Sequence, residues 1–439
     1  MAKKATGSKK FKYAKSRELF EKASTVIPLA SQTFSKSYVS YYKGDIPFFV
    51  ERGKGAYVWD VDGNKFLDLI CALLPVVLGY DYKPVNKAID DQMRRGISFS
   101  LPHPLEYQLA KKLTELIPCA EMVRFGKNGT DVTSAAVRLA RYITKRDKVI
   151  VCGYHGWQDW YIGSTTRNGG VPKAVQRLTI QAPFNDITAL EKIYKDNKGE
   201  IAAMIIEPMH YQPPVKGYLK QVKELTHKNG ALLIFDEIVT GFRIDLGGAQ
   251  KYFNVVPDLA TFGKSAGNGM PISMLVGKAK HMQKVEEIFF SGTFGGETLS
   301  LAATLKTIEE IEKRHVIKHI WKQGEALKKE VNGLIKKNNL QDTLEVEGYG
   351  WLTSLAIKPA AGFAPLEIKS YFQQEMLRHH ILTLGAHNMS YAHGDKERKL
   401  IVQAYREILP LIADALKNKT ILKNLEGQPI QDLFRVRNN

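Results

Sequence analysis

The chain has 439 residues, of which 44% are hydrophobic and 25% charged, a composition that predicts a globular protein with a large core in two or three domains. No apolar stretch reaches the about 20 residues that cross a bilayer, and the basic start MAKKATGSKKFKYAKSR has no apolar core behind it, so it is not a secretory signal. The net charge of +18 is spread along the whole chain without a nucleic-acid motif. It favours a basic surface, able to attract an acidic substrate, over a nucleic-acid or membrane partner.

The cysteines Cys71, Cys119 and Cys152 are odd in number, and their spacing fits neither a disulfide framework nor a zinc site. We therefore expect a cytoplasmic protein without a bound metal.

The N-terminal part is expected to be a basic mobile tail over residues 1–20, followed by a segment over 21–75 that belongs to a small domain. The stretch YAKSRELFEKASTVIP, residues 13–28, predicts a helix that ends at Pro28. Two short strand-like runs flank Asp-Gly-Asn in GKGAYVWDVDGNKFLDLI, which predicts a hairpin.

Residues 76–312 alternate between helical and strand-like patterns. Helices are expected at EYQLAKKLTELI, DVTSAAVRLARYI and GYLKQVKELTHKNG, and strands at KVIVCGYH, IAAMIIEP, ALLIFDEI, DLATFGK and SMLVGK. This alternation predicts an α/β domain with a doubly wound, mainly parallel sheet. Residues 313–439, with long charged helices, are expected to form a small α+β C-terminal domain.

Polar residues follow four of the expected strands, in CGYH, IEP, FDE and FGK. Ligands of open α/β sheets bind at the carboxyl ends of the strands, so these residues could converge in one crevice. Lys264 in FGK could supply a desolvated amine nucleophile, or simply extend its stem over the surface. Gly129 and Thr130, at the start of a helix, could bind a phosphate, or Thr130 or Asp131 could cap that helix.

Each of three further residues allows two interpretations, one functional and one structural. Tyr154 could stack on a flat ring or cover the core, and His155 could be catalytic or structural. Asp236 could keep a pyridine nitrogen protonated, or pair with Arg243 or another arginine. Together, a lysine, a phosphate cradle, a stacking aromatic and a pyridinium partner match one cofactor, pyridoxal phosphate.

The chain resembles the class III, fold-type I aminotransferases that use pyridoxal phosphate, and within them the group of glutamate-1-semialdehyde 2,1-aminomutase. The resemblance runs from about Phe20 to about Leu416. It rests on GAYVWDVDGNKFLDL, VRFGKNGTDVTSAAVRLAR, GYHGWQD, IIEP, LLIFDEIVTGFR, PDLATFGKSAGNGMPIS and SGTFGGETLSLAA.

The resemblance implies roles for individual residues. Lys264 matches the Schiff-base lysine that also moves the substrate proton, and Asp236 the partner of the pyridine nitrogen. Thr293 matches a threonine that reaches the phosphate of the neighbouring subunit, which implies a homodimer with composite sites. The remaining matches are Tyr154 and His155 in the ring-stacking motif, Gly129 and Thr130 in the phosphate cradle, Ile238 beneath the ring, and Glu207 near the site. Asn128 also belongs to the cradle, but it replaces a serine of the family.

Departures from the family concern the substrate. Lys36 stands where the aminomutase has a carboxylate-binding arginine, and a lysine lacks the bidentate fork. The segment HGWQDWYIGSTTRNGGVP is shorter than the aminomutase's gating loop and carries Trp157, Trp160 and Tyr161. His387 and Asn388 stand near the place of an acidic pocket residue. We therefore expect a bulkier, hydroxyl-rich substrate such as an amino sugar, unless the tryptophans only pack the domain seam.

Three functions follow. The first is a dimeric aminotransferase acting on an amine and an aldehyde or ketone. The second is the aminomutase itself, which forms 5-aminolevulinate, and Lys36 and the short loop count against it. The third is a non-catalytic basic binding protein, which would be expected to have lost Lys264, Asp236 or Thr130.

Overall fold

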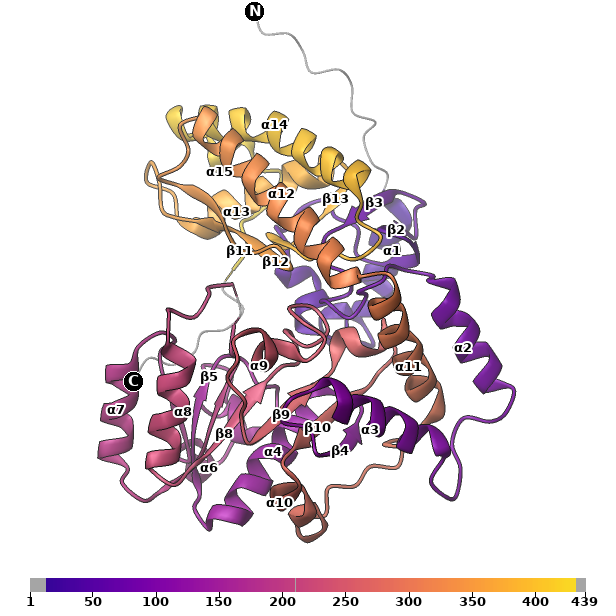
Figure 1. The fold of residues 1–439 in the computed structure, drawn as a ribbon. Coiled ribbons are helices and arrows are strands. Elements are labelled where there is room, and N and C mark those ends of the chain that lie inside the picture. The colour runs from indigo at the N-terminus through magenta and orange to yellow at the C-terminus, as the bar shows by residue number, and fades with distance from the viewer. Residues whose placement is uncertain (1–12, 210, 432–439) are drawn as a thin grey trace, which may run out of the picture. The chain divides into compact units, whose positions relative to one another are not determined.

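The structure is a computed structural model that describes residues 13–209 and 211–431 (Figure 1). Within these ranges, no helix is both long and apolar enough to cross a membrane. The chain forms two compact units, a smaller one of residues 13–73, 79–82 and 319–431 and a larger one of residues 74–78 and 83–318. Of the tail predicted for residues 1–20, residues 1–12 lie outside the described part, and helix α1 (Ala14–Ser24) occupies most of the rest.

The larger unit is built on a seven-stranded sheet with the order β4-β10-β9-β8-β7-β5-β6. Its strands are β4 (Met122–Gly126), β5 (Lys148–Cys152), β6 (Thr179–Gln181), β7 (Ile201–Ile206), β8 (Leu232–Asp236), β9 (Leu259–Phe262) and β10 (Ser273–Gly277). Strands β6, β5, β7, β8 and β9 pair in parallel, and only β10 runs antiparallel to its neighbours β9 and β4. The predicted mainly parallel sheet is confirmed.

The helices of the larger unit pack against this sheet or against one another (Figure 1). They are α2 (Lys83–Met93), α3 (Pro104–Leu116), α4 (Gly129–Thr144), α5 (Asp159–Ile162), α6 (Lys173–Gln176), α7 (Ile187–Asp196), α8 (Tyr218–Lys228), α9 (Gly248–Tyr252), α10 (Ala279–Met282) and α11 (Thr298–Lys313). All six residues of β7 are buried, as expected of a strand covered on both faces. Helix α4 has a buried apolar side that packs across the middle of the sheet. Its burial fixes the start of α4 beside the strand ends.

The smaller unit contains two sheets. The first has the order β1 (Val50–Lys54), β2 (Tyr57–Asp60), β3 (Lys65–Asp68) and β13 (Ile381–Leu382), and the second has β11 (Leu344–Tyr349), β12 (Leu352–Ile357) and β14 (Ala386–His387). The hairpin predicted around Asp-Gly-Asn is confirmed, because β2 and β3 pair antiparallel. The unit's helices are α1, α12 (Val316–Lys337), α13 (Pro365–Arg378), α14 (Asp395–Lys417) and α15 (Ile421–Asn424), of which α12 starts in the larger unit.

Candidate active site

Four strand ends of the larger unit carry the predicted site residues. Strands β5, β7, β8 and β9 are parallel, so their carboxyl ends lie along one edge of the sheet. Tyr154 follows β5, Glu207 follows β7, Asp236 ends β8 and Lys264 follows β9. The topology therefore gathers residues that are up to 110 positions apart in the sequence.

Asp236 is buried and has several polar partners. One carboxylate oxygen, Oδ2, lies 2.8 Å from His155 Nδ1. The other, Oδ1, accepts hydrogen bonds from Thr261 Oγ1 at 3.1 Å and from the Ile238 backbone N–H at 3.2 Å. These bonds offset the cost of placing a carboxylate at the end of a buried strand. They also fix the carboxylate in one orientation while Oδ2 keeps a lone pair for a further donor.

The adjacent carboxylate, Glu237, has a different role. It is fully buried and accepts hydrogen bonds from Thr240 Oγ1 at 2.7 Å and from the Gln250 backbone N–H at 3.1 Å. Burial raises the pKa of Glu237 to about 7, and these hydrogen bonds oppose the rise. Gln250 in turn accepts from the Cys119 backbone N–H at 2.9 Å. The hydrogen bonds of Glu237 thus hold the loop after β8 in place within the larger unit.

Lys264 starts a short 3₁₀ turn, Lys264–Gly267, directly after β9. Its φ of 38° lies in the left-handed region, which is strained for a residue with a side chain and often marks a functional site. Two bonds hold this turn: Ser265 Oγ donates to Leu74 O at 3.0 Å, and Asn268 Oδ1 accepts from the Leu78 N–H at 2.8 Å. The neighbourhood therefore over-determines the lysine's strained backbone.

The charge of Lys264 is also perturbed. Burial lowers the pKa of its ammonium, the carboxylates of Glu207 and Asp236 oppose this, and the nearby Arg243 lowers the pKa further. A lowered pKa makes the neutral, nucleophilic amine more available.

The start of α4 fits a phosphate group. The hydroxyl of Thr130 is buried and has no hydrogen-bond partner among the described residues. The first N–H groups of a helix lack acceptors within the helix, and its positive dipole end attracts anions. A Cβ at Gly129 would lie 3.2 Å from Ile238, so a side chain there would crowd the cradle. The backbone N–H of the exposed Asn128 donates to Asp131 Oδ2 at 2.7 Å, so Asp131 and not Thr130 caps the helix start.

Tyr154 is 51% exposed, although it follows a buried strand. Its ring meets Tyr161 edge-on, with centroids 5.6 Å apart, and an aromatic ring of this kind can stack on a planar ligand. Its neighbour His155 is buried, and its Nε2 has no hydrogen-bond partner among the described residues. An acidic partner, an amine, an unpaired hydroxyl and an exposed ring together fit the pyridine, aldehyde and phosphate of pyridoxal phosphate.

Three of the predicted substrate residues have weaker support. Lys36, His387 and Asn388 belong to the smaller unit, where Lys36 is exposed. The ring of His387 is buried, with Nδ1 2.9 Å from Thr353 Oγ1 and Nε2 2.7 Å from Tyr405 OH. Both ring nitrogens are therefore engaged, which argues against the prediction that His387 contacts substrate.

Asn388 is also largely committed to the fold. It is 7% exposed, and its Nδ2 donates to Ile70 O at 3.0 Å, although its Oδ1 has no partner among the described residues.

The aromatic segment after Tyr154 divides into two kinds of residue. Trp157 is 67% exposed and stays a candidate for substrate contact. Trp160 and Tyr161 lie in the core of the larger unit, where Trp160 Nε1 donates to Ser134 Oγ at 2.9 Å. Of the two tryptophans that suggested a sugar-like substrate, Trp160 is thus a packing residue.

Thr261 is the site residue that sequence reasoning missed. It is fully buried on β9, and its hydroxyl orients Asp236. A single polar residue inside the apolar strand LATF is the signal that could have found it.

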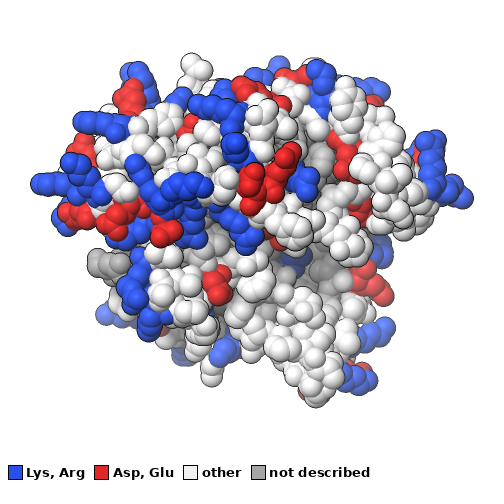
Figure 2. Space-filling model, turned by 90° about the horizontal axis from the view of Figure 1, so that it is seen from below, with Lys and Arg blue, Asp and Glu red and all other residues white. Residues whose placement is uncertain are grey.

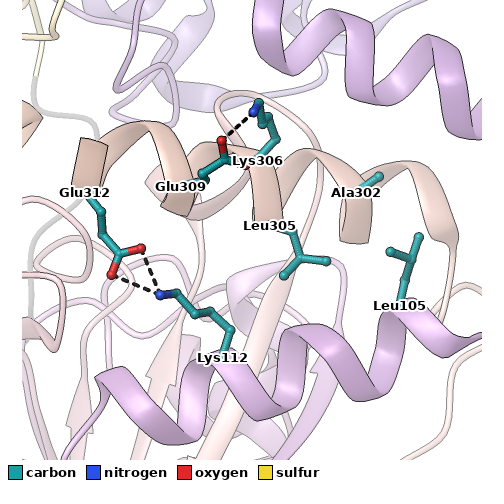
Figure 3. Close-up of a pocket in the computed structure, with 7 residues that line it drawn as sticks. All are labelled: Leu105, Lys112, Ala302, Leu305, Lys306, Glu309 and Glu312. Atoms are coloured by element: carbon teal, nitrogen blue, oxygen red, sulfur yellow. Dashed lines mark hydrogen bonds and ion pairs between the residues drawn. The ribbon is translucent and has the colours of Figure 1, made fainter. Parts of the chain in front are cut away.

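A hollow of about 420 Å³ on the larger unit lies elsewhere, between α3 and α11 (Figure 3). Its apolar lining is Leu105, Ala302 and Leu305, and its charged residues are paired, as in the Lys112–Glu312 ion pair at 2.8 Å. It contains none of the strand-end residues, so we do not regard it as the active site.

Comparisons with known proteins agree with this site. The family described as "Aminotransferase class-III" matches residues 38–389. The 3-aminobutyryl-CoA aminotransferase of Cloacimonas acidaminovorans is 35% identical over 92% of this chain and 98% of its own length. The glutamate-1-semialdehyde 2,1-aminomutase of Methanocaldococcus jannaschii is 39% identical over 75% of this chain and 80% of its own.

A solved structure gives the same result. The FumI protein of Sphingopyxis sp. MTA144, in the internal aldimine form with pyridoxal phosphate, is similar with a TM-score of 0.84 and 25% identity. The match covers 92% of this chain and 97% of FumI. Fold and site together define an enzyme of the fold-type I class that uses pyridoxal phosphate as its cofactor. Within that class, the chain belongs to the class III aminotransferases.

Proposed function

We propose that the enzyme is an aminotransferase that takes its amino group from a 3-amino acyl thioester of the coenzyme A type. The observation that carries the aminotransferase part is the convergence of Lys264, Asp236 and the unpaired Thr130 hydroxyl at one edge of a single sheet. No residue that the chemistry requires has been lost, which disfavours a non-catalytic binding protein.

The residues divide the work as follows. Bound pyridoxal phosphate would supply an electron sink for the carbon that carries the amino group. Asp236, oriented by His155 and Thr261, would hold a proton on the pyridine nitrogen. The amine of Lys264 would hold the cofactor at its aldehyde carbon. Once freed, this amine would take the proton from the substrate carbon and deliver it to that cofactor carbon. Thr130 and the start of α4 would hold the phosphate.

The substrate class is supported by the extent of the similarity and by charge. The relative named for 3-aminobutyryl-CoA matches nearly the whole of both chains, whereas the aminomutase match leaves a quarter of this chain uncovered. Coenzyme A carries several phosphate charges, which a chain of net charge +18 would attract. On the face shown in Figure 2, lysine and arginine side chains outnumber acidic ones and lie in several groups.

The aminomutase is the second candidate, because relatives with that name reach 39% identity. An exposed lysine at position 36, in place of an arginine, disfavours it. The amino-sugar hypothesis is weakened because Trp160 lies in the core and the ring of His387 is engaged within the fold, and it depends mainly on Trp157.

A half-reaction screen tests the proposal. The pyridoxal form of the enzyme would be mixed separately with 3-aminobutyryl-CoA, free 3-aminobutyrate, a hexosamine and glutamate-1-semialdehyde, and bleaching of the cofactor absorbance followed. We expect the thioester to react fastest, by about tenfold or more over the free acid, if the coenzyme A part contributes binding energy. Equal rates for the two would reject the thioester, and formation of 5-aminolevulinate from the semialdehyde would identify the aminomutase.

We also propose that the enzyme is a homodimer in which Thr293 of one subunit reaches the phosphate of the other. Support comes from exposed apolar side chains in two adjoining loops, Ile97, Phe99, Leu101, Phe289 and Phe294. The loops are joined where Thr298 N–H, at the start of α11, donates to Ile97 O at 3.0 Å. Exposed apolar residues grouped in this way are typical of a protein interface.

Substitution of the apolar loops tests the dimer. Leu101→Asp should produce monomers in sedimentation and weaken cofactor binding, whereas Thr293→Ala should weaken cofactor binding in an intact dimer. A Leu101→Asp protein that still sediments as a dimer would contradict the placement of the interface.

A cytoplasmic location is part of the proposal, supported by three cysteines that are all free and buried.

A further inference from the structure

Glu207 is a buried carboxylate that joins two strand ends of the active site. It directly follows β7, and its Oε2 accepts a hydrogen bond from the Tyr154 backbone N–H at 2.9 Å. Its own backbone N–H donates to Cys152 O at 3.0 Å. The end of β7 therefore fixes the backbone turn that leads from β5 to the exposed ring of Tyr154.

The turn itself is held from two sides. Gly153 has a φ of 118°, a conformation that L-residues rarely adopt, and a Cβ there would lie 2.5 Å from Glu207 Oε2. On the other side, Tyr161 OH donates to Gly153 O at 2.8 Å. The carboxylate is thus packed against glycine backbone, and a larger residue at position 153 would displace it. The backbone of Tyr154 is immobilised while its ring remains accessible.

Glu207 also acts on Lys264 through charge. Strands β7 and β9 flank β8 in the sheet, so Glu207 and Lys264, which follow them, lie at the same edge two strands apart. The carboxylates of Glu207 and Asp236 both oppose the effect of burial on the pKa of Lys264. Asp236 is already engaged with His155, Thr261 and Ile238. Glu207 is therefore a second carboxylate that can compensate the ammonium in the free enzyme.

We propose that Glu207 is a positioning residue with two separable functions: its acceptor oxygen fixes the backbone of Tyr154, and its negative charge balances Lys264. The first function requires a hydrogen-bond acceptor at the correct distance, and the second requires only the charge. This inference depends on Lys264 as the cofactor-binding lysine but not on which amine is the substrate.

Two variants separate the functions. Glu207→Gln keeps an acceptor oxygen at the same reach and removes the charge. Glu207→Asp keeps the charge and is one methylene too short to reach the Tyr154 N–H in the same geometry. Glu191→Gln, at an exposed position on α7, is the matched control for loss of one carboxylate from the larger unit. Circular dichroism would establish that each variant is folded. If Glu207→Gln is not folded, Glu207→Ala, which also lacks the charge, would take its place in the charge experiment.

The charge function is read from the cofactor-free protein. Trace labelling with acetic anhydride over a pH series, followed by mass spectrometry of the Lys264 peptide, gives the titration of that amine. Removal of a nearby negative charge destabilises the ammonium, so Glu207→Gln should label about three- to tenfold faster than wild type at neutral pH. Glu207→Asp and Glu191→Gln should label like wild type. An unchanged labelling rate in a folded Glu207→Gln protein would overturn the charge function. A merely structural role of Glu207 would leave this rate unchanged.

The positioning function is read with 4′-deoxypyridoxine 5′-phosphate, which lacks the aldehyde and cannot bond to lysine. Glu207→Asp should bind this probe about tenfold more weakly, because one hydrogen bond that fixes Tyr154 is lost, while Glu207→Gln should stay within about twofold of wild type. Wild-type affinity in Glu207→Asp would overturn this function. Borohydride reduction of the loaded wild type identifies the cofactor lysine independently, so an error in the assignment of Lys264 would be distinguished from an error about Glu207.

Discussion

Two buried histidines show how similar residues serve different purposes in the two units. His155 lies at the strand ends of the larger unit, with Nδ1 beside Asp236 and Nε2 without a partner among the described residues. His387 lies in the smaller unit, with both ring nitrogens bonded to neutral hydroxyl groups. Burial lowers the pKa of His387 to about 4, so it is neutral near pH 7.

The difference extends to the surroundings of each ring. Around His155 lie the hydrogen-bonded carboxylate of Asp236, a strained lysine and an unpaired hydroxyl, and the last two are costly in a folded protein unless a ligand compensates them. Around His387 both ring nitrogens are satisfied by hydroxyl groups, which stabilises the ring without a ligand. The hydrogen-bond partners of each ring, rather than the presence of a histidine, therefore distinguish the two places.

The largest expected effect comes from the lysine at the strand ends. Lys264→Ala should lower transamination by at least about 10⁴-fold, because the covalent attachment and the proton transfer are both lost. Single-turnover bleaching of the cofactor measures this. Lys284→Ala, at an exposed position of the same unit, should retain wild-type rates. Substantial turnover in the Lys264→Ala protein would place the chemistry elsewhere.

Removing the charge of Asp236 should have the next largest effect. Asp236→Asn keeps the shape but no longer stabilises a protonated pyridine nitrogen, and we expect a loss of about 10²-fold or more in kcat. The pH dependence of the bound cofactor's absorbance should change as well. If kcat falls without any spectral change, the carboxylate supports the fold and not the ring nitrogen.

The neutral state of His387 predicts a dependence of stability on pH. The unfolded chain takes up a proton near pH 6.5, whereas the folded chain does so only near pH 4. The contribution of His387 to stability is therefore complete above pH 6.5 and is lost as the pH falls toward 4, by on the order of 3 kcal/mol. Denaturant unfolding at several pH values measures it. In His387→Gln this part of the pH dependence should disappear, and cofactor binding should be unchanged if the residue is structural.

The smallest effect contrasts two hydroxyl groups on α4. Thr130→Ala removes a hydroxyl without a partner in the cofactor-free protein, so the free energy of unfolding should change by less than about 0.5 kcal/mol, while cofactor affinity should fall about tenfold. Thr133→Ala removes a hydroxyl that donates to His155 O at 2.8 Å and should cost about 1 kcal/mol of stability. A Thr130→Ala protein that loses stability but no affinity would show that Thr130 is a packing residue.

The sequence predicted the elements and the lysine–aspartate pair because both depend on local pattern. Short apolar strands that end in polar residues specify a parallel sheet and point to its carboxyl edge. The amino-acid sequence was less informative where one type of residue can serve either the core or the site. Trp157 and Trp160 together suggested a bulky substrate, but Trp160 is buried in the core. Thr261 stands out locally only as a polar residue in an apolar strand, and its bond to Asp236 depends on a neighbouring strand.

By itself, the amino-acid sequence determined the α/β class, the order of the strands along the chain and the identity of the residues at their ends. Only the tertiary structure decided which of those residues are satisfied by one another and which are left for a ligand. The physical reason is that hydrogen-bond satisfaction depends on distances between strands far apart in sequence, as for His155 and Asp236, which are 81 residues apart and yet 2.8 Å from each other.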